Sequence, residues 1–222
     1  MSPRFKDRKD AGRQLGASLA KRYGGRHDVL VLGLPRGGVP VAYEVASALG
    51  APLDILIVRK LGLPQHKEYA MGAIASGGVT VLDEDVLRTM AVSRQALDEV
   101  IAAEQKELRR REDSYRVHGL AASMKDRTVI LVDDGLATGC TMRAAIASAR
   151  SNSPHAVVVA VPVAAPDTCD SVRREVDEAV CLAAPEFFRA VGFWYDDFPQ
   201  TSDQEVRELL ENARPDVLGK SS

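Results

Sequence analysis

Two adjacent aspartates stand at the end of an apolar run and directly before a loop of small and hydroxyl residues. The stretch is VILVDDGLATGCT, residues 129–141, and the two acids are Asp133 and Asp134. Small residues let backbone N–H groups approach a ligand closely, and the N-terminus of the helix expected after the loop favours an anion. The stretch therefore predicts a phosphate site whose members are Gly135, Leu136, Ala137, Thr138, Gly139, Cys140 and Thr141.

The two acids need a partner other than the phosphate, because like charges repel each other. Carboxylates accept hydrogen bonds, and vicinal hydroxyl groups donate them. A ribose 5-phosphate satisfies both halves of the motif, with its 2- and 3-hydroxyls on Asp133 and Asp134. Successive strand residues point to opposite faces, so both acids can meet one sugar only where the strand ends. A metal-binding pair and a phospho-acceptor pair are the other interpretations of two adjacent acids.

Two more loops with anion-binding character follow predicted strands. The first is GLPRGG, where Arg36 adds a cation and Gly37 and Gly38 allow close approach. The second begins with Arg59 and Lys60, and continues as LGLPQHKEY. A simple tight turn and two solvated cations are the plainer interpretations of these loops. Three such loops at neighbouring strand ends favour one anionic ligand.

The elements that must position these loops alternate between strand and helix. Near-continuous apolar strands joined by helices predict a parallel sheet covered on both faces, with ligands beyond the carboxyl ends of its strands. A β-hairpin is expected at the end of residues 61–78. The predicted strands are 28–33, 53–60, 128–134, 156–163 and 178–184, and the predicted helices are 7–23, 39–50, 93–116, 141–150, 167–176 and 202–212.

The composition narrows the class of protein. A length of 222 residues fits one α/β domain, and 45% apolar residues can build a sizeable core. The net charge of −2 gives no basic field for nucleic acid. No apolar run approaches the ~18 residues that span a bilayer, and the charged N-terminus does not resemble a signal peptide. We expect a cytoplasmic protein without a membrane or nucleic-acid partner.

The three cysteines are Cys140, Cys169 and Cys181. Their number is odd and no C-x-x-C spacing occurs, so the sequence predicts neither a zinc site nor a disulfide framework. Cys140 lies inside the phosphate loop, where a small packing residue is a more common role than a nucleophile.

The stretch VILVDDGLATGCT resembles the phosphoribosyl-pyrophosphate motif of the type I phosphoribosyltransferases, and the similarity extends over about residues 29–197. The resemblance implies an α/β fold with a parallel sheet, flanking helices and a small C-terminal hood near 184–212. A single domain would cover 1–222, with a mobile loop and a long helix inserted near 61–117. It further implies a Mg²⁺-dependent glycosyltransferase (a pentosyltransferase) that moves the phosphoribosyl group of phosphoribosyl pyrophosphate to a nitrogenous base and releases pyrophosphate.

The resemblance also assigns roles to individual residues. Asp133 and Asp134 would hold the ribose and face Mg²⁺ directly or through water. Glu68, which with Tyr69 matches a Glu-Tyr pair in the family's mobile loop, would accept a proton or lie beside the sugar cation. Pyrophosphate would be bound by Arg36, Gly37, Gly38, Arg59 and Lys60.

In the tail, FFRAVGFWYDDF resembles the hood of purine-type members. Phe188 or Trp194 would stack on the base, and Asp196 would lie near the metal and pyrophosphate. An aromatic cluster is more often part of a core than of a ligand site. VPVAAPDT lacks the lysine with which hypoxanthine–guanine enzymes contact a 6-oxo group, and this weakens the case for a 6-oxopurine acceptor.

Three other classes of protein share parts of this pattern. A receiver domain also has paired acids at a strand end, but it needs a lysine after a later strand, and this sequence offers none there. A donor-synthesising kinase of the same fold is usually longer. A non-catalytic nucleotide- or phosphoribosyl-pyrophosphate-binding regulator of the same fold remains the alternative function. The long helix from Ser93 offers a surface that allows a homodimer.

Overall fold

The computed structural model describes residues 4–66, 68–115 and 122–213. Its centre is a five-stranded parallel sheet in the order β2-β1-β6-β7-β8. This confirms the predicted parallel sheet. The strands are β1 (Val29–Gly33), β2 (Leu53–Ile55), β6 (Thr128–Val132), β7 (Ala156–Val163) and β8 (Glu178–Ala183).

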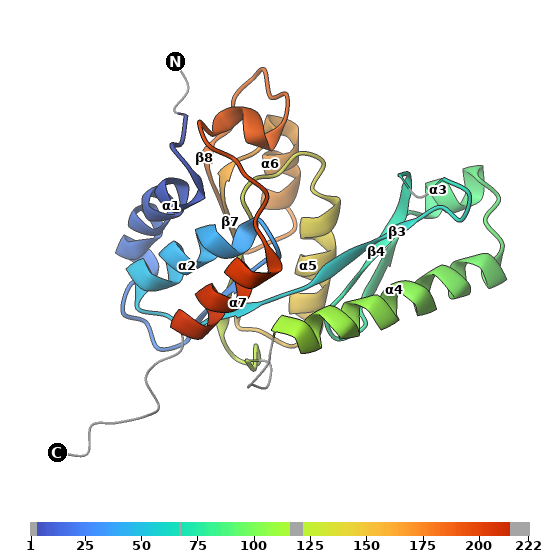
Figure 1. The fold of residues 1–222 in the computed structure, drawn as a ribbon, viewed down its shortest axis with the longest axis horizontal. Helices are drawn as coiled ribbons and strands as arrows, with labels where there is room; N and C mark the ends of the chain where they lie inside the picture. The colour runs from blue at the N-terminus through green and yellow to red at the C-terminus, as the bar shows by residue number, and fades with distance from the viewer. Residues whose placement is uncertain (1–3, 67, 116–121, 214–222) are drawn as a thin grey trace.

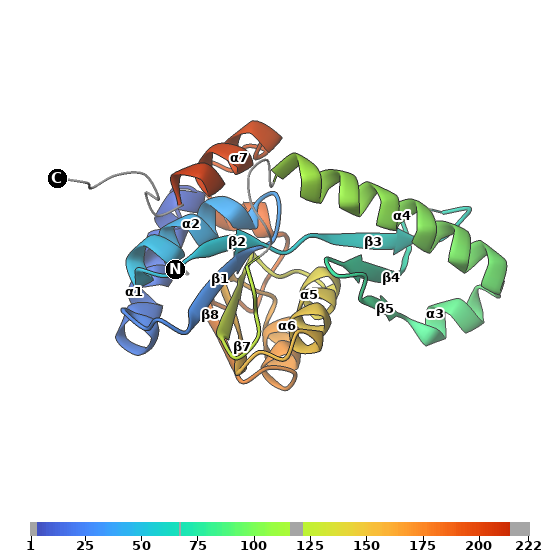
Figure 2. The ribbon, with the colours of Figure 1, turned by 90° about the horizontal axis from the view of Figure 1, so that it is seen from below.

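Helices cover both faces of this sheet, which explains why its strands are apolar throughout (Figures 1 and 2). Leu30 and Leu32 of β1 pack on one side, in a core shared with α5 and α6. Val29 and Val31 pack on the other side, with α1 and α2. The helices are α1 (Arg8–Tyr23), α2 (Gly38–Leu49), α5 (Cys140–Ser151) and α6 (Pro166–Arg173).

The first two helices pack unusually close together, because glycine stands where they meet. A Cβ atom on Gly12 would lie 2.8 Å from the carbonyl oxygen of Val41 on α2. A Cβ atom on Gly16 would lie 2.7 Å from the Cβ of Ala48. Asp7 caps α1 by accepting a hydrogen bond from the N–H of Asp10 at 2.7 Å. These contacts fix where the N-terminal end of α1 lies.

A second, antiparallel sheet extends away from the parallel one and carries the long predicted helix (Figures 1 and 2). We call residues 58–115 the arm. The side chain of Ser93 caps the long helix by accepting a hydrogen bond from the N–H of Ala96 at 3.2 Å. Arg116, the predicted last residue of that helix, lies outside the described residues. The arm contains β3 (Val58–Gly62), β4 (Ala70–Ala75), β5 (Thr80–Leu82), α3 (Glu84–Thr89) and α4 (Arg94–Tyr115).

The prediction of one strand over 53–60 is wrong. β2 ends at Ile55, and β3 begins at Val58 in the other sheet. Leu56 is buried in the core between the parallel sheet and α5, whereas Ile57 is buried in the core of the arm. The chain passes directly from one core to the other, so the apolar run continues without interruption. The sequence therefore carries no sign of the break between β2 and β3.

The prediction that the cysteines form no disulfide is also wrong. Cys169 of α6 and Cys181 of β8 are joined, only 12 residues apart in the sequence. The chain turns between α6 and β8, and the strand returns beneath the helix, which brings the two sulfur atoms together. Cys140 is a free, exposed cysteine.

The C-terminal part of the described chain divides in two. Residues 184–199 lie beyond the carboxyl end of β8 and include η1 (Val191–Trp194). The last helix, α7 (Asp203–Asn212), packs Val206 and Leu210 into the core shared with α2 and α4. None of the helices in 4–66, 68–115 or 122–213 is both long and apolar enough to cross a membrane.

The close contact between α1 and α2 predicts the effect of filling it. Gly12→Val should lower the free energy of unfolding by about 1–3 kcal/mol, because the added methyl groups force the helices apart. For a chain of this size each kcal/mol corresponds to about 2–4 °C in Tm. Thermal unfolding checks this, with Ala17→Val, on the exposed side of α1, as the control. An equal loss in both variants would contradict the packing argument.

Candidate functional site

The two predicted acids lie just past the end of their strand. β6 ends at Val132, so Asp133 and Asp134 belong to the loop that follows. The N–H of Asp134 donates to Oδ1 of Asp133 at 2.9 Å. Both acids thus lie beyond the strand end, where the sequence places the predicted ribose site.

The glycine turn after β1 lies against these acids. A Cβ atom on Gly37 would lie 2.0 Å from Oδ2 of Asp134, and one on Gly38 would lie 3.0 Å from Oδ1 of Asp133. Glycine is needed here for the approach of the acids themselves. The N–H of Gly38 donates to the carbonyl of Leu34 at 3.0 Å, whereas those of Arg36 and Gly37 make no hydrogen bond within the described chain. These two remain as predicted anion donors.

An arginine that sequence reasoning missed completes the charge arrangement. Nε of Arg8, the first residue of α1, donates to Oδ2 of Asp134 at 2.9 Å. The two side chains are only 11% and 16% exposed. They are 126 residues apart in the sequence, so no local pattern connects them.

Burial shapes the ionisation of the two acids. Burial and the neighbouring charge of Asp134 raise the pKa of Asp133 well above its usual range. Burial also raises the pKa of Asp134, against the opposing effect of the Arg8 guanidinium. The hydroxyl of Tyr195 donates to the backbone carbonyl of Asp134 at 2.6 Å. The pair is thus costly to keep ionised without a cation or a hydrogen-bonding ligand.

Two side chains anchor the predicted phosphate loop by donating hydrogen bonds to its carbonyl groups. Oγ1 of Thr168 on α6 donates to the carbonyl of Ala137 at 2.7 Å, and Arg143 donates to that of Thr138 at 3.4 Å. In a trans peptide the N–H points opposite to the C=O, so the N–H groups of Thr138 and Gly139 face away from these two side chains. Both amides, and that of Cys140, make no hydrogen bond within the described chain. They form a row of unpaired donors at the start of α5.

Two other loop residues serve the fold rather than the row of donors. The N–H of Leu136 donates to the carbonyl of Val163 at 2.9 Å, and its side chain is buried. The amide of Leu136 is therefore already used in a bridge to β7, and the predicted role of Leu136 at the phosphate is not tested. A Cβ atom on Gly135 would lie 2.6 Å from Cγ1 of Val191, so this glycine allows the tail to approach the loop.

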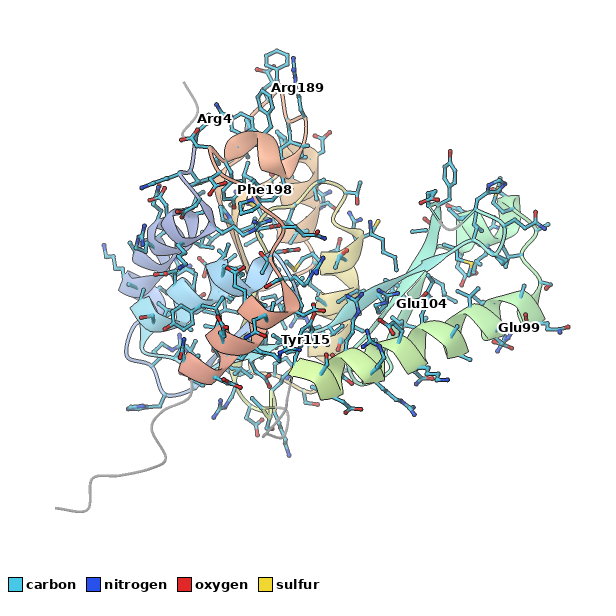
Figure 3. All side chains as sticks on the ribbon, viewed as in Figure 1. Arg4, Glu99, Glu104, Tyr115, Arg189 and Phe198 are labelled. Carbon is cyan, nitrogen blue, oxygen red and sulfur yellow. A yellow bond between two sulfur atoms is a disulfide. The ribbon has the colours of Figure 1, made fainter. Side chains whose placement is uncertain are left out.

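Arg36, the predicted cation for pyrophosphate, forms an ion pair with the first residue of α7. Its Nη1 lies 3.8 Å from Oδ1 of Asp203 at the start of α7. Tyr115, at the end of α4 beside α7 (Figure 3), donates to the same oxygen at 2.6 Å. That hydrogen bond lowers the pKa of Asp203. Arg36 is a third exposed and can reach an incoming anion.

The arm does not bring Arg59 to the acids. Its guanidinium lies 2.7 Å from Oε2 of Glu104, whose side chain extends from α4 (Figure 3). The predicted contact of Arg59 with pyrophosphate is not tested, and the strand that carries Arg59 belongs to the antiparallel sheet rather than to the parallel one. Lys60, the next residue, is exposed and points to the opposite face of β3, where its predicted role is not tested.

The predicted Glu-Tyr pair lies in the turn between β3 and β4. Glu68 is exposed and Tyr69 is 68% exposed. The turn lies at the end of the arm remote from the parallel sheet (Figure 2). This arrangement does not bring Glu68 to the acid pair, and its role as a proton acceptor stays a prediction.

The tail residues lie mostly in a small core of their own. Phe188 and Trp194 are half-buried against a cluster that includes Phe5 and Tyr195. Their predicted stacking on a base is not tested. Asp196 is exposed and lies 3.6 Å from Arg4, so the structure pairs it with a surface arginine rather than with the acid pair. The predicted position of Asp196 near a metal and pyrophosphate is not tested.

The predicted Mg²⁺ can be tested against the oxygens present. Oδ1 of Asp133 and Oδ2 of Asp134 are engaged, which leaves one oxygen on each carboxyl group without a hydrogen bond in the described chain. The described residues contain no cluster of three or more His, Cys, Asp or Glu side chains around a common point. Mg²⁺ normally keeps waters and binds through one or two carboxylates and substrate phosphates. The acid pair fits that kind of site, completed by a diphosphate ligand.

Comparisons with known proteins agree with this geometry. A family model described as "Phosphoribosyl transferase domain" matches residues 5–197. "Putative phosphoribosyl transferase Rv0571c" from Mycobacterium tuberculosis (strain ATCC 25618 / H37Rv) is 48% identical over 212 residues, which cover 96% of this chain and 47% of that protein. The chain thus spans about half the length of the curated relatives it matches.

Solved structures share the fold. The crystal structure of TT1426 from Thermus thermophilus has a TM-score of 0.82 and 42% identity, and covers 96% of this chain and 100% of that one. The AQ2163 protein from Aquifex aeolicus has a TM-score of 0.52 and 14% identity, and the match covers 91% of this chain and 85% of that one. This similarity is one of fold alone. The predicted type I phosphoribosyltransferase-like fold is confirmed.

The two acids should respond to substitution in opposite ways. The pKa of Asp133 is higher in the fold than in the unfolded chain, so its ionisation weakens the fold as the pH rises from about 4. Asp133→Asn should therefore raise Tm at pH 7–8, and the gain should vanish near pH 4. Asp134→Asn leaves Arg8 buried without its partner and should cost about 3–5 kcal/mol. Thermal unfolding across this pH range checks both, and a loss of stability in both variants would contradict it.

The hydroxyl of Thr168 should matter for phosphate binding. Thr168→Val frees the carbonyl of Ala137 and lets its peptide rotate, which should weaken binding of ribose 5-phosphate by about 2- to 10-fold, the worth of one hydrogen bond. Thr168→Ser keeps the hydroxyl and should bind nearly as the unchanged protein does. Isothermal titration measures this, and equal affinities for all three proteins would refute the proposed hold on the loop.

Proposed function

The chain belongs to the phosphoribosyl transferase domain family, and from this premise we propose that it moves the phosphoribosyl group of phosphoribosyl pyrophosphate to a nitrogenous base and releases pyrophosphate. The observation that carries the proposal is the acid pair at the end of β6, with the unused amides of Thr138, Gly139 and Cys140 beside it. Hydroxyl acceptors next to phosphate donors match a ribose 5-phosphate group. This makes the chain a pentosyltransferase.

The residues of the site would divide the ligand among them. The free oxygens of Asp133 and Asp134 accept hydrogen bonds from the ribose hydroxyls, and their charge favours positive charge on the sugar ring. The amides of Thr138, Gly139 and Cys140 hold the 5-phosphate. The amides of Arg36 and Gly37, with the Arg36 guanidinium, receive the diphosphate. Holding donor and acceptor in line then removes much of the entropic cost of the reaction.

Mg²⁺ is the proposed cofactor, held through water by Asp133 and Asp134 and by the diphosphate. It would neutralise charge on the departing pyrophosphate. Arg36 adds a second positive charge once it moves from Asp203 to the ligand. Lys60 remains a proposed further contact for the pyrophosphate, and Glu68 a proposed proton acceptor.

The C-terminal tail would bind the acceptor base. Phe188 or Trp194 would stack on the base, within a hood formed by residues 184–212. Nucleotide salvage is the proposed context, and the cytoplasmic location and the homodimer stay predictions from the sequence. A regulator of the same fold would bind the donor without releasing pyrophosphate, and the activity assay separates the two functions.

Replacing both acids tests the proposal. In a pyrophosphate-release assay with phosphoribosyl pyrophosphate, Mg²⁺ and a panel of bases, the Asp133→Asn and Asp134→Asn double variant should lose about 10²- to 10³-fold in rate, the effect of removing a preorganised stabilising group. A chelator should abolish release in the unchanged protein. Asp98→Asn, at an exposed ion pair with Arg94 on α4, is the control and should keep full activity.

Two results would overturn parts of this proposal. A fully active double variant would remove the ribose assignment. Tight donor binding by calorimetry, with no release on any base, would replace the transferase by the regulator.

A further inference from the structure

A disulfide links the helix beside the phosphate loop to the last strand of the parallel sheet (Figure 1). It joins Cys169 of α6 to Cys181 of β8, and the proposed reaction uses neither residue. Cys169 is fully buried, whereas Cys181 is partly accessible to solvent. A thiol needs access to only one sulfur of a disulfide to attack it. The bond is therefore open to reduction from the side of Cys181.

The disulfide provides much of the attachment of α6 to the sheet. The helix has eight residues, all within the described chain, and two of them are buried, Cys169 and Val172. Breaking the bond leaves Val172 as the other buried side chain that holds the helix in place. Because protein interiors are close-packed, two protonated sulfur atoms need more room there than two bonded ones. Reduction should therefore shift α6 relative to β8.

The same helix also holds the phosphate loop. Thr168, which directly precedes the buried cysteine, donates from Oγ1 to the carbonyl of Ala137 at 2.7 Å. A Cβ atom on Gly139 would lie 2.9 Å from Cγ2 of Thr168. Ala165, the N-cap of α6, donates from its N–H to the carbonyl of Leu136 at 2.9 Å. A displacement of α6 is therefore transmitted to the loop that carries the unpaired amides.

We propose that the Cys169–Cys181 disulfide is a redox-controlled tether of the phosphate loop, and that its reduction by a dithiol weakens the binding of a sugar phosphate there. The proposal rests on the proposed function for the identity of the ligand. It goes beyond that function because it makes the affinity of the loop depend on a covalent bond that does not touch the ligand.

The reduction is a thiol–disulfide exchange in two steps. A thiolate of the dithiol attacks Sγ of Cys181 and forms a mixed disulfide with it. The bond to Cys169 breaks, and its sulfur leaves as a thiolate and takes up a proton. The second thiol of the dithiol then attacks the reductant's sulfur in the mixed disulfide, and Cys181 leaves and is protonated. Two electrons and two protons pass to the protein, and the dithiol becomes a cyclic disulfide.

The binding test uses ribose 5-phosphate as the probe, with the full chain oxidised or treated with dithiothreitol. A thiol assay defines the two states, because Cys140 is the one free cysteine before reduction and all three cysteines are free after it. Isothermal titration should give a Kd about 2- to 10-fold higher for the reduced protein, the worth of one hydrogen bond. Equal Kd values, or a disulfide that dithiothreitol reduces only after unfolding, would overturn the proposal.

Two variants separate the tether from other effects of the dithiol. Thr168→Val lacks the hydroxyl that transmits the shift, so reduction should have little further effect on its Kd. The double variant Cys169→Ala and Cys181→Ala cannot form the bond, and it should bind as the reduced protein does, with or without the dithiol. It also controls for Cys140, which the dithiol can reach. A full response to the dithiol in either variant would contradict the tether.

A ligand-free measurement separates failure of this proposal from failure of the proposed function. Hydrogen–deuterium exchange should become faster on reduction at the N–H groups of Ala165 and Cys169, which donate to Leu136 and Ala165. The N–H of Leu63, which donates to Tyr69 in the arm, should keep its rate. Unchanged exchange at α6 would refute the tether even in a protein that transfers no phosphoribosyl group. Faster exchange without binding of ribose 5-phosphate to either form would uphold the tether and refute the proposed ligand instead.

Discussion

The site depends on one constraint, which is the close approach of two carboxyl groups to the Gly37–Gly38 turn after β1. Asp133 and Asp134 lie so close to Gly37 and Gly38 that a side chain on either glycine would clash with them. Gly135 in turn lets the tail pack directly against the loop that follows the two acids. This crowding buries the acids and raises the cost of their charge. One guanidinium, from Arg8, offsets part of that cost and brings α1 into the site. The side chains of Asp133 and Asp134 are thus the point where the end of β6, the glycine turn, α1 and the tail meet.

The sequence predicts the parallel sheet well, because its strands are covered on both faces and stay apolar from end to end. Strand β7 and the helices that begin near Asp7, Ser93 and Ser202 follow directly from local patterns. Prediction fails where one apolar run serves two cores, at Leu56 and Ile57. Local patterning reports that a residue is buried, but not against which neighbours.

The same limit applies to the site. The phosphate loop and the acids are contiguous in the sequence, so the composition of the stretch reveals their chemistry. Arg8 and Thr168 come from helices that are distant from this stretch in the sequence. Each contacts the stretch through a hydrogen bond that only the fold creates. Arg59 carries the right charge for an anion, yet the strand that holds it turns towards Glu104. Residue type predicts a kind of ligand, but it does not tell which residues the fold brings together around that ligand.

The central claim is that the amides of Thr138, Gly139 and Cys140 and those of Arg36 and Gly37 together receive one phosphoribosyl diphosphate. Hydrogen–deuterium exchange with and without phosphoribosyl pyrophosphate and Mg²⁺ tests it directly, because it reports on these amides whether or not a base is turned over. The account predicts slower exchange at Thr138, Gly139 and Cys140, and at Arg36 and Gly37, with the outer end of the arm unchanged. Protection confined to the arm, or none at either loop under saturating donor, would contradict it.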